Sequence, residues 1–178
     1  MRKSIFVTAF AVLALTAASA AFAAKNSGEF ASFAAKDIDG NEVTQEVLAK
    51  AELTVMNVWG TFCGPCLREM PALGKLASEY KDKNVQFIGV VIDVLDRNGG
   101  INDKQVEKAR GLVAKTGAAY LHLLPSKDLM DAKLAAIYAI PETYFVDAGG
   151  RILDSVTGAM AEDQWRTKIE SVLAEMKK

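Results

Sequence analysis

The fold of this chain is decided by the stretch Trp59-Gly60-Thr61-Phe62-Cys63-Gly64-Pro65-Cys66-Leu67-Arg68-Glu69-Met70-Pro71. It continues from residues 53–59, an apolar run rich in β-prone residues that predicts a buried strand. Beyond the cysteines, apolar side chains recur at helical spacing, at Leu67, Met70, Leu73, Leu76 and Tyr80. The two cysteines therefore lie where a strand ends and a helix begins.

Cys63 and Cys66 are the only cysteines among the 178 residues, and two residues separate them. A disulfide between them would close almost no loop, and in the chain-entropy model such a bond stabilises a fold very little. The spacing therefore indicates redox chemistry or metal binding rather than a structural cross-link.

The position of the pair predicts different roles for the two cysteines. A helix N-terminus offers unpaired N–H groups and a partial positive charge, and both favour a thiolate at Cys63. We therefore expect the Cys63 thiol to have a pKa below that of a free cysteine and to attack the substrate disulfide. Cys66 falls inside the first helical turn, where it is better shielded, and would resolve the mixed disulfide. Gly64 and Pro65 fit this place, because proline is tolerated in a first helical turn.

Metal binding is the main alternative to redox chemistry. A structural zinc site needs four ligands, and the chain offers no further cysteine and a single histidine, His122. Copper(I) suits soft thiolates, and a copper carrier would take His122 as a third ligand. A copper-binding or non-catalytic binding module therefore stands as the second interpretation, while the favoured one includes no metal.

The N-terminal residues predict a cleaved leader for export. Arg2 and Lys3 precede an uncharged apolar run over residues 5–18, and residues 21–23 (Ala-Phe-Ala) carry small residues where a signal peptidase reads them. We expect residues 1–23 to be removed and residues 24–178 to form one domain outside the cytoplasm, in the periplasm; a retained membrane anchor is the alternative. The formal net charge of −1 gives no sign of nucleic-acid binding.

The other segments alternate between strands and helices. A hairpin is predicted over residues 33–43, strands over 85–92 and 120–124, and a second hairpin from 142–146 and 152–157. Helices are predicted up to Gly117, over residues 127–138 and through residues 165–176, and a surface loop of unassigned role over residues 93–103. This order predicts an α/β fold with a central mixed β-sheet, helices on both faces and an N-terminal β-hairpin.

Residues 59–71 resemble the active-site stretch of thioredoxin-like proteins, and most closely that of the exported TlpA/ResA-like branch. A second marker is Ile140-Pro141-Glu142-Thr143-Tyr144-Phe145-Val146-Asp147, which resembles the segment that carries a cis-proline in this family. The resemblance spans nearly the whole mature chain. It implies a thioredoxin fold and a thiol–disulfide oxidoreductase whose only redox centre is the Cys63–Cys66 pair.

The resemblance also implies roles for individual residues. Pro141 would follow a cis peptide bond beside the cysteines, and the Ile140 backbone would pair with an incoming peptide as an added strand. Glu69, one helical turn after Cys66, would carry a proton to or from it, as a catalytic acid or base. The substrate groove would be formed by Trp59, Phe62, Gly64, Pro65, Ile140, Pro141 and Glu142.

Two positions depart from the pattern of the family. Asn57 occupies the place of a buried aspartate found in cytosolic thioredoxins, and an amide cannot take up a proton at neutral pH. Proton handling is therefore expected at Glu69. Phe62 replaces the usual tryptophan before the first cysteine, so an apolar ring is kept and an indole donor is lost.

Gly64-Pro65 resembles the dipeptide of the reducing members of the family. The resemblance therefore implies a periplasmic reductant, kept reduced by a membrane thiol protein that donates electrons. We expect the protein to be a monomer. Its substrates would be protein disulfides, with apocytochrome c as one candidate.

Overall fold

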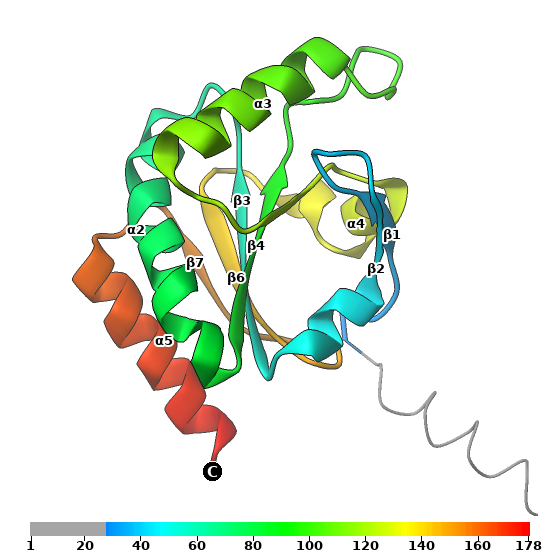
Figure 1. Ribbon diagram of the computed structural model, residues 1–178. Helices are drawn as coiled ribbons and strands as arrows, with labels where there is room; N and C mark the ends of the chain where they lie inside the picture. Colours follow the sequence, from blue (N-terminus) through cyan, green and yellow to red (C-terminus); the bar gives the residue numbers. More distant parts are fainter. Residues whose placement is uncertain (1–27) are drawn as a thin grey trace, which may run out of the picture.

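The computed structural model describes residues 28–178 (Figure 1). The predicted leader, residues 1–23, and its cleavage site lie outside these residues. The described elements are, in chain order, β1 (Ala34–Lys36), β2 (Glu42–Thr44), the 3-10 helix η1 (Gln45–Lys50), β3 (Leu53–Trp59), α2 (Gly64–Tyr80), η2 (Lys81–Lys83), β4 (Val85–Val91), α3 (Asp103–Thr116), β5 (Leu121–Leu123), α4 (Lys127–Ala132), η3 (Leu134–Ala136), β6 (Glu142–Asp147), β7 (Ile152–Thr157) and α5 (Glu162–Met176).

The central sheet has five strands in the order β5-β4-β3-β6-β7. β3 pairs in parallel with β4, and β4 with β5, whereas β6 is antiparallel to both β3 and β7. The sheet is therefore mixed, as the sequence predicts. β1 and β2 form the predicted hairpin as a separate antiparallel pair, with Gly40 at φ 90° in its turn.

The alternation of side chains along β3 assigns the two faces of the sheet. Leu53 and Val55 point to one face, where they pack with α2 and α5 around Trp165. Met56 and Val58 point to the other face, where the N-terminal hairpin, η1, α4 and η3 cover them. Figure 1 shows α2 and α5 side by side on the first face, with the hairpin and α4 across the sheet. Helices therefore lie on both faces, and every residue of β3 is buried.

The predicted helix over residues 127–138 is wrong in its second half. α4 ends at Ala132, and Lys133 leaves helical geometry at φ −157° and ψ −34°. The short 3-10 turn η3 follows, and its Leu134 is buried in the same core cluster as Leu129 of α4. A continuous helix would carry residues 137–140 straight on, whereas the break lets the chain turn towards the cysteines.

No helix within residues 28–178 is both long enough and apolar enough to cross a membrane.

Candidate active site

Cys63 caps the N-terminus of α2. Cys63 and Cys66 are joined by a disulfide with their Cα atoms 5.3 Å apart. The Cys63 backbone is extended, and its Sγ accepts a hydrogen bond from the Cys66 N–H at 3.2 Å. This places the first sulfur against the unpaired N–H groups of the helix, where a thiolate would be stabilised once the disulfide is reduced.

The two sulfurs differ in access. Cys63 is 5% exposed, whereas Cys66 is completely buried under the first turn of α2. Of the two residues, only Cys63 therefore has any surface that a substrate could contact. This asymmetry favours the predicted roles, with Cys63 as the attacking group and Cys66 as the resolving group, and the roles themselves stay a prediction.

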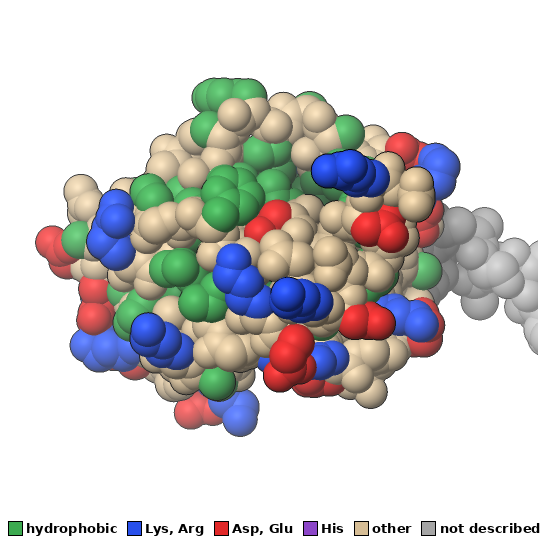
Figure 2. All heavy atoms as spheres, turned by 90° about the horizontal axis from the view of Figure 1, so that it is seen from above, with side chains coloured by type: hydrophobic (Ala, Val, Ile, Leu, Met, Phe, Trp, Pro, Cys, Tyr) green, Lys and Arg blue, Asp and Glu red, His purple; other side chains and the backbone are tan. Residues whose placement is uncertain are grey.

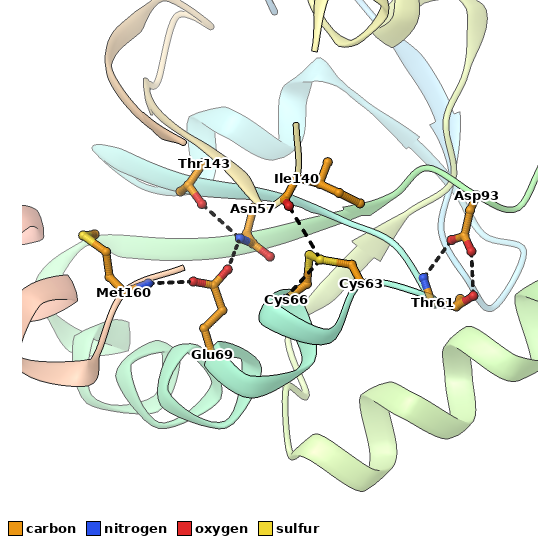
Figure 3. The surroundings of a disulfide bond; sticks show 9 residues. All are labelled: Asn57, Thr61, Cys63, Cys66, Glu69, Asp93, Ile140, Thr143 and Met160. Atoms are coloured by element: carbon orange, nitrogen blue, oxygen red, sulfur yellow. Dashed lines mark hydrogen bonds between the residues drawn. A yellow bond between two sulfur atoms is a disulfide. The ribbon is translucent and has the colours of Figure 1, made fainter. Parts of the chain in front are cut away.

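The segment before β6 faces the disulfide from the other side. The Ile140–Pro141 peptide bond is cis, as the resemblance implies, and the Ile140 carbonyl oxygen lies 3.7 Å from Cys63 Sγ (Figure 3). The Ile140 N–H makes no hydrogen bond in the described part of the chain. Glu142, 9% exposed, begins β6 opposite Val58 of β3. The sheet thus brings the cysteine motif and the cis-proline segment into one site, where Cys63 contacts Ile140, 77 residues further along the chain.

Glu69 is buried beneath this site, with an exposed fraction of 3%. Its Oε1 accepts a hydrogen bond from Asn57 Nδ2 at 3.0 Å, and its Oε2 accepts one from the Met160 N–H at 3.2 Å (Figure 3). Burial raises the pKa of Glu69 to about 7, and these two hydrogen bonds offset only part of that effect. Glu69 can therefore gain or lose a proton close to neutral pH.

Asn57 connects Glu69 to the sheet. Its Nδ2 also donates to Thr143 Oγ1 at 2.9 Å, and the two residues lie directly opposite each other on β3 and β6. Its Oδ1 is buried and has no hydrogen-bond partner within the described residues, although buried polar atoms are normally paired. The Asn57 side chain is therefore hydrogen-bonded through its nitrogen only. Its oxygen is a buried acceptor that lies near the disulfide (Figure 3).

Trp59, which is predicted to form part of the substrate groove, is fully buried, so its side chain is not open to solvent. Its indole N–H donates to His122 Nδ1 at 3.1 Å, and His122 Nε2 lies 2.8 Å from the Ala118 carbonyl oxygen. Because an indole nitrogen can only donate, Nδ1 must be the acceptor and Nε2 must carry the proton. Burial lowers the pKa of His122 to about 4, so the ring stays neutral.

This bonding bears on the copper interpretation. Both ring nitrogens of His122 are engaged, so neither is free to act as a third ligand beside the cysteines. Across residues 28–178, no group of three or more His, Cys, Asp or Glu side chains could hold a metal ion.

Asp93 was not singled out from the sequence, yet it anchors the loop before Cys63. Its carboxylate accepts hydrogen bonds from the Thr61 N–H at 2.9 Å and from Thr61 Oγ1 at 2.6 Å (Figure 3). Gln105 of α3 donates to the same carboxylate at 3.3 Å. Asp93 follows the carboxyl end of β4, the parallel neighbour of β3, and this position was the signal that could have identified it.

Two exposed aromatic side chains lie in the segments that lead to Cys63 and to Ile140. Phe62 is 71% exposed and Tyr138 is 88% exposed. A Cβ atom on Gly60 would lie 3.0 Å from both the Phe62 ring and Ile140 Cδ1, so these two side chains meet over a glycine that has no room for one of its own. Figure 2 looks onto this end of the molecule and shows apolar side chains at the surface with charged ones around them.

A disulfide of this kind at the first turn of a helix, facing a cis-proline on a mixed sheet, defines a thioredoxin-fold thiol–disulfide oxidoreductase. The chain belongs to the AhpC/TSA family, whose model matches residues 27–155.

Comparisons with individual proteins agree with this class. The chain is similar to the thiol-disulfide oxidoreductase ResA of Halalkalibacterium halodurans, with 29% identity over 98% of this chain and 95% of the relative. It is 31% identical to the thioredoxin-like protein YneN of Bacillus subtilis, over 78% of this chain and 75% of the relative. Among solved structures, MTB dsbF superposes with a TM-score of 0.63 at 25% identity, over 81% of this chain and 96% of that one.

Proposed function

We propose that this protein is an exported reductase of protein disulfides. The observation that carries the proposal is the placement of Cys63, whose sulfur caps α2 beside the exposed Phe62 and the Ile140 carbonyl. The leader predicted over residues 1–23 supports export, and the Gly64-Pro65 dipeptide supports the reducing direction. The active form is proposed to be a monomer, with no cofactor other than the cysteine pair.

The reaction proceeds by two thiol–disulfide exchanges. The Cys63 thiolate attacks one sulfur of the substrate disulfide, a Cys63–substrate bond forms, and the second substrate sulfur leaves as a thiolate. The Cys66 thiol then loses its proton and attacks Cys63 Sγ. The Cys63–Cys66 disulfide forms, the first substrate sulfur leaves, and two electrons have passed to the substrate.

Glu69 is the proposed acceptor of the Cys66 proton. It lies one helical turn beyond Cys66 on α2 and has a pKa of about 7, so its carboxylate is present at neutral pH and can still be protonated. Asn57 holds this carboxylate in place and cannot take the proton itself. The proton would return to Cys66 when the protein is reduced again.

The substrate backbone would pair with Ile140 as an added strand, which supports an extended polypeptide as the substrate. A membrane protein with a reduced thiol pair would regenerate the dithiol. Assembly of cytochrome c is one process that needs such a reductant, and its apoprotein is a candidate substrate.

The test of this proposal is reduction of a protein disulfide by the pre-reduced chain. Insulin should be reduced by the native chain and not by Cys63→Ser, whereas Cys66→Ser should accumulate a mixed disulfide that is visible by mass spectrometry. Equal activity of Cys63→Ser and the native chain would contradict the assignment of the nucleophile.

The direction of electron flow needs a separate measurement. Equilibration with glutathione should give a potential nearer the roughly −270 mV of thioredoxin than the roughly −120 mV of a strong oxidant. A value close to the latter would overturn the reductase assignment while leaving the exchange chemistry intact.

A further inference from the structure

The guanidinium of Arg68 lies at the same end of α2 as the disulfide. Its Nη1 atom is 3.4 Å from the position that a Cβ atom on Gly64 would occupy. Side chains of an α-helix lean towards the helix N-terminus, and residues four apart share one side of the helix. Arg68 therefore reaches back over the turn that carries Cys63.

This guanidinium has no partner among the residues that the structure describes. Arg110, Arg151 and Arg166 each form an ion pair with a carboxylate. Arg68 makes no hydrogen bond or ion pair anywhere in residues 28–178, and its side chain is exposed. It also carries the only charge in residues 60–68. Within this stretch, Arg68 is thus an unpaired cation among uncharged residues.

We infer that Arg68 selects disulfide substrates that carry a carboxylate next to the cysteine under attack. The inference rests on the proposed function and specifies the partner: an extended polypeptide with Asp or Glu flanking its disulfide cysteine. The exposed Phe62 beside Cys63 offers contact to its apolar side chains, and the fork of N–H donors on Arg68 matches a carboxylate. The contact forms in the encounter complex and in the mixed disulfide, so it raises kcat/KM for such substrates.

The size of the effect follows from the exposure of Arg68. Ion pairs at protein surfaces contribute about 0.2–1 kcal/mol and weaken in salt. By the constant of 1.4 kcal/mol per factor of ten, we expect a preference of up to about fivefold.

The experiment uses disulfide-bridged peptides that are identical except for the residue beside the cysteine, which is Glu, Gln or Lys. Single-turnover reduction by the pre-reduced protein is followed by acid quench and mass spectrometry at low salt. The variants are Arg68→Gln and Arg68→Lys, and the matched control is Arg97→Gln, because Arg97 is also exposed but lies in the loop over residues 93–103.

We expect the native chain and Arg97→Gln to reduce the Glu peptide about two- to fivefold faster than the Gln peptide, and the Lys peptide slowest. Arg68→Gln should abolish this order, Arg68→Lys should keep part of it, and about 0.5 M salt should suppress it. Equal rates for the three peptides with the native chain would overturn the inference, as would an unchanged preference in Arg68→Gln.

Two further outcomes separate this inference from the function on which it rests. If Arg68→Gln slows the three peptides by the same factor, Arg68 acts on the Cys63 thiolate and not on the substrate, and the inference is wrong while the reductase function stands. If the native chain reduces none of the peptides nor a small disulfide such as hydroxyethyl disulfide, the proposed function fails and the inference fails with it.

Discussion

Replacing Glu69 by glutamine should make the protein more stable at neutral and alkaline pH. The carboxyl group is 3% exposed, and its pKa is raised from an ordinary 4.5 to about 7 by burial. The folded state therefore holds this proton more tightly than the unfolded chain. Between pH 4.5 and pH 7 the native chain should lose stability as the pH rises, because folding then requires a buried carboxylate.

The expected magnitude follows from the difference between the two pKa values. At 1.36 kcal/mol per pKa unit, the buried carboxylate costs about 3 kcal/mol at pH 8, about 2 kcal/mol at pH 6 and almost nothing at pH 4. Glutamine keeps the shape of the side chain. Its oxygen can accept from the Met160 N–H, and its NH₂ can donate to Asn57 if that amide turns over, so the network can be preserved.

The assay is urea unfolding of the oxidised protein from pH 4 to pH 8, for the native chain, Glu69→Gln and the control Glu175→Gln, whose side chain is exposed. The difference in unfolding free energy between Glu69→Gln and the native chain should grow by about 3 kcal/mol across this range, whereas that of the control should stay nearly constant. Parallel pH profiles for Glu69→Gln and the native chain would show that Glu69 titrates normally and would refute the argument.

Two more predictions concern the surroundings of the site. A Cβ atom on Gly89 would lie 2.1 Å from His122 Nδ1, so Gly89→Ala should lower the free energy of unfolding by about 1–3 kcal/mol, measured by urea unfolding. Gly111→Ala on α3, where a Cβ meets nothing within 4 Å, is the control and should not destabilise; equal losses would contradict the packing argument. Asp93→Ala removes the acceptor of the Thr61 N–H and should speed hydrogen exchange of that amide by about five- to a hundredfold, corresponding to about 1–3 kcal/mol. Asp96→Ala, which removes only bonds within its own loop, should leave the Thr61 amide unchanged, and slow exchange in both variants would refute the anchoring role of Asp93.

The local elements around the cysteines could be predicted from the sequence because their signals are local. β3 covers the residues expected for it, since a strand buried on both faces consists mainly of apolar residues. α2 begins at Gly64 and continues through its apolar repeat. The chain turn at Gly117 and the two hairpins are likewise marked by residues that favour turns. The cis bond before Pro141 came from resemblance, because spacing alone does not distinguish cis from trans.

The helix over residues 127–138 shows where local signals fail. Its residues favour a helix throughout. However, contacts with the rest of the fold bury Leu134 beside Leu129 and set the course of the chain from there to Ile140. Such contacts override helix propensity, which amounts to less than about 1 kcal/mol per residue for ordinary residues.

The sequence by itself predicted the class of fold, from the order of its strands and helices, and the place of the cysteine pair between a strand and a helix, because periodicity and turn residues are local signals. The different roles of the two cysteines stay a prediction. Only the tertiary structure decided the environment of the pair. It buries Glu69 against Met160, 91 residues away, and joins Asn57 to Thr143 across 86 residues. Within residues 28–178 it also leaves Arg68 without a partner. Burial and solvation depend on which distant segments meet, and a one-dimensional pattern does not contain that information.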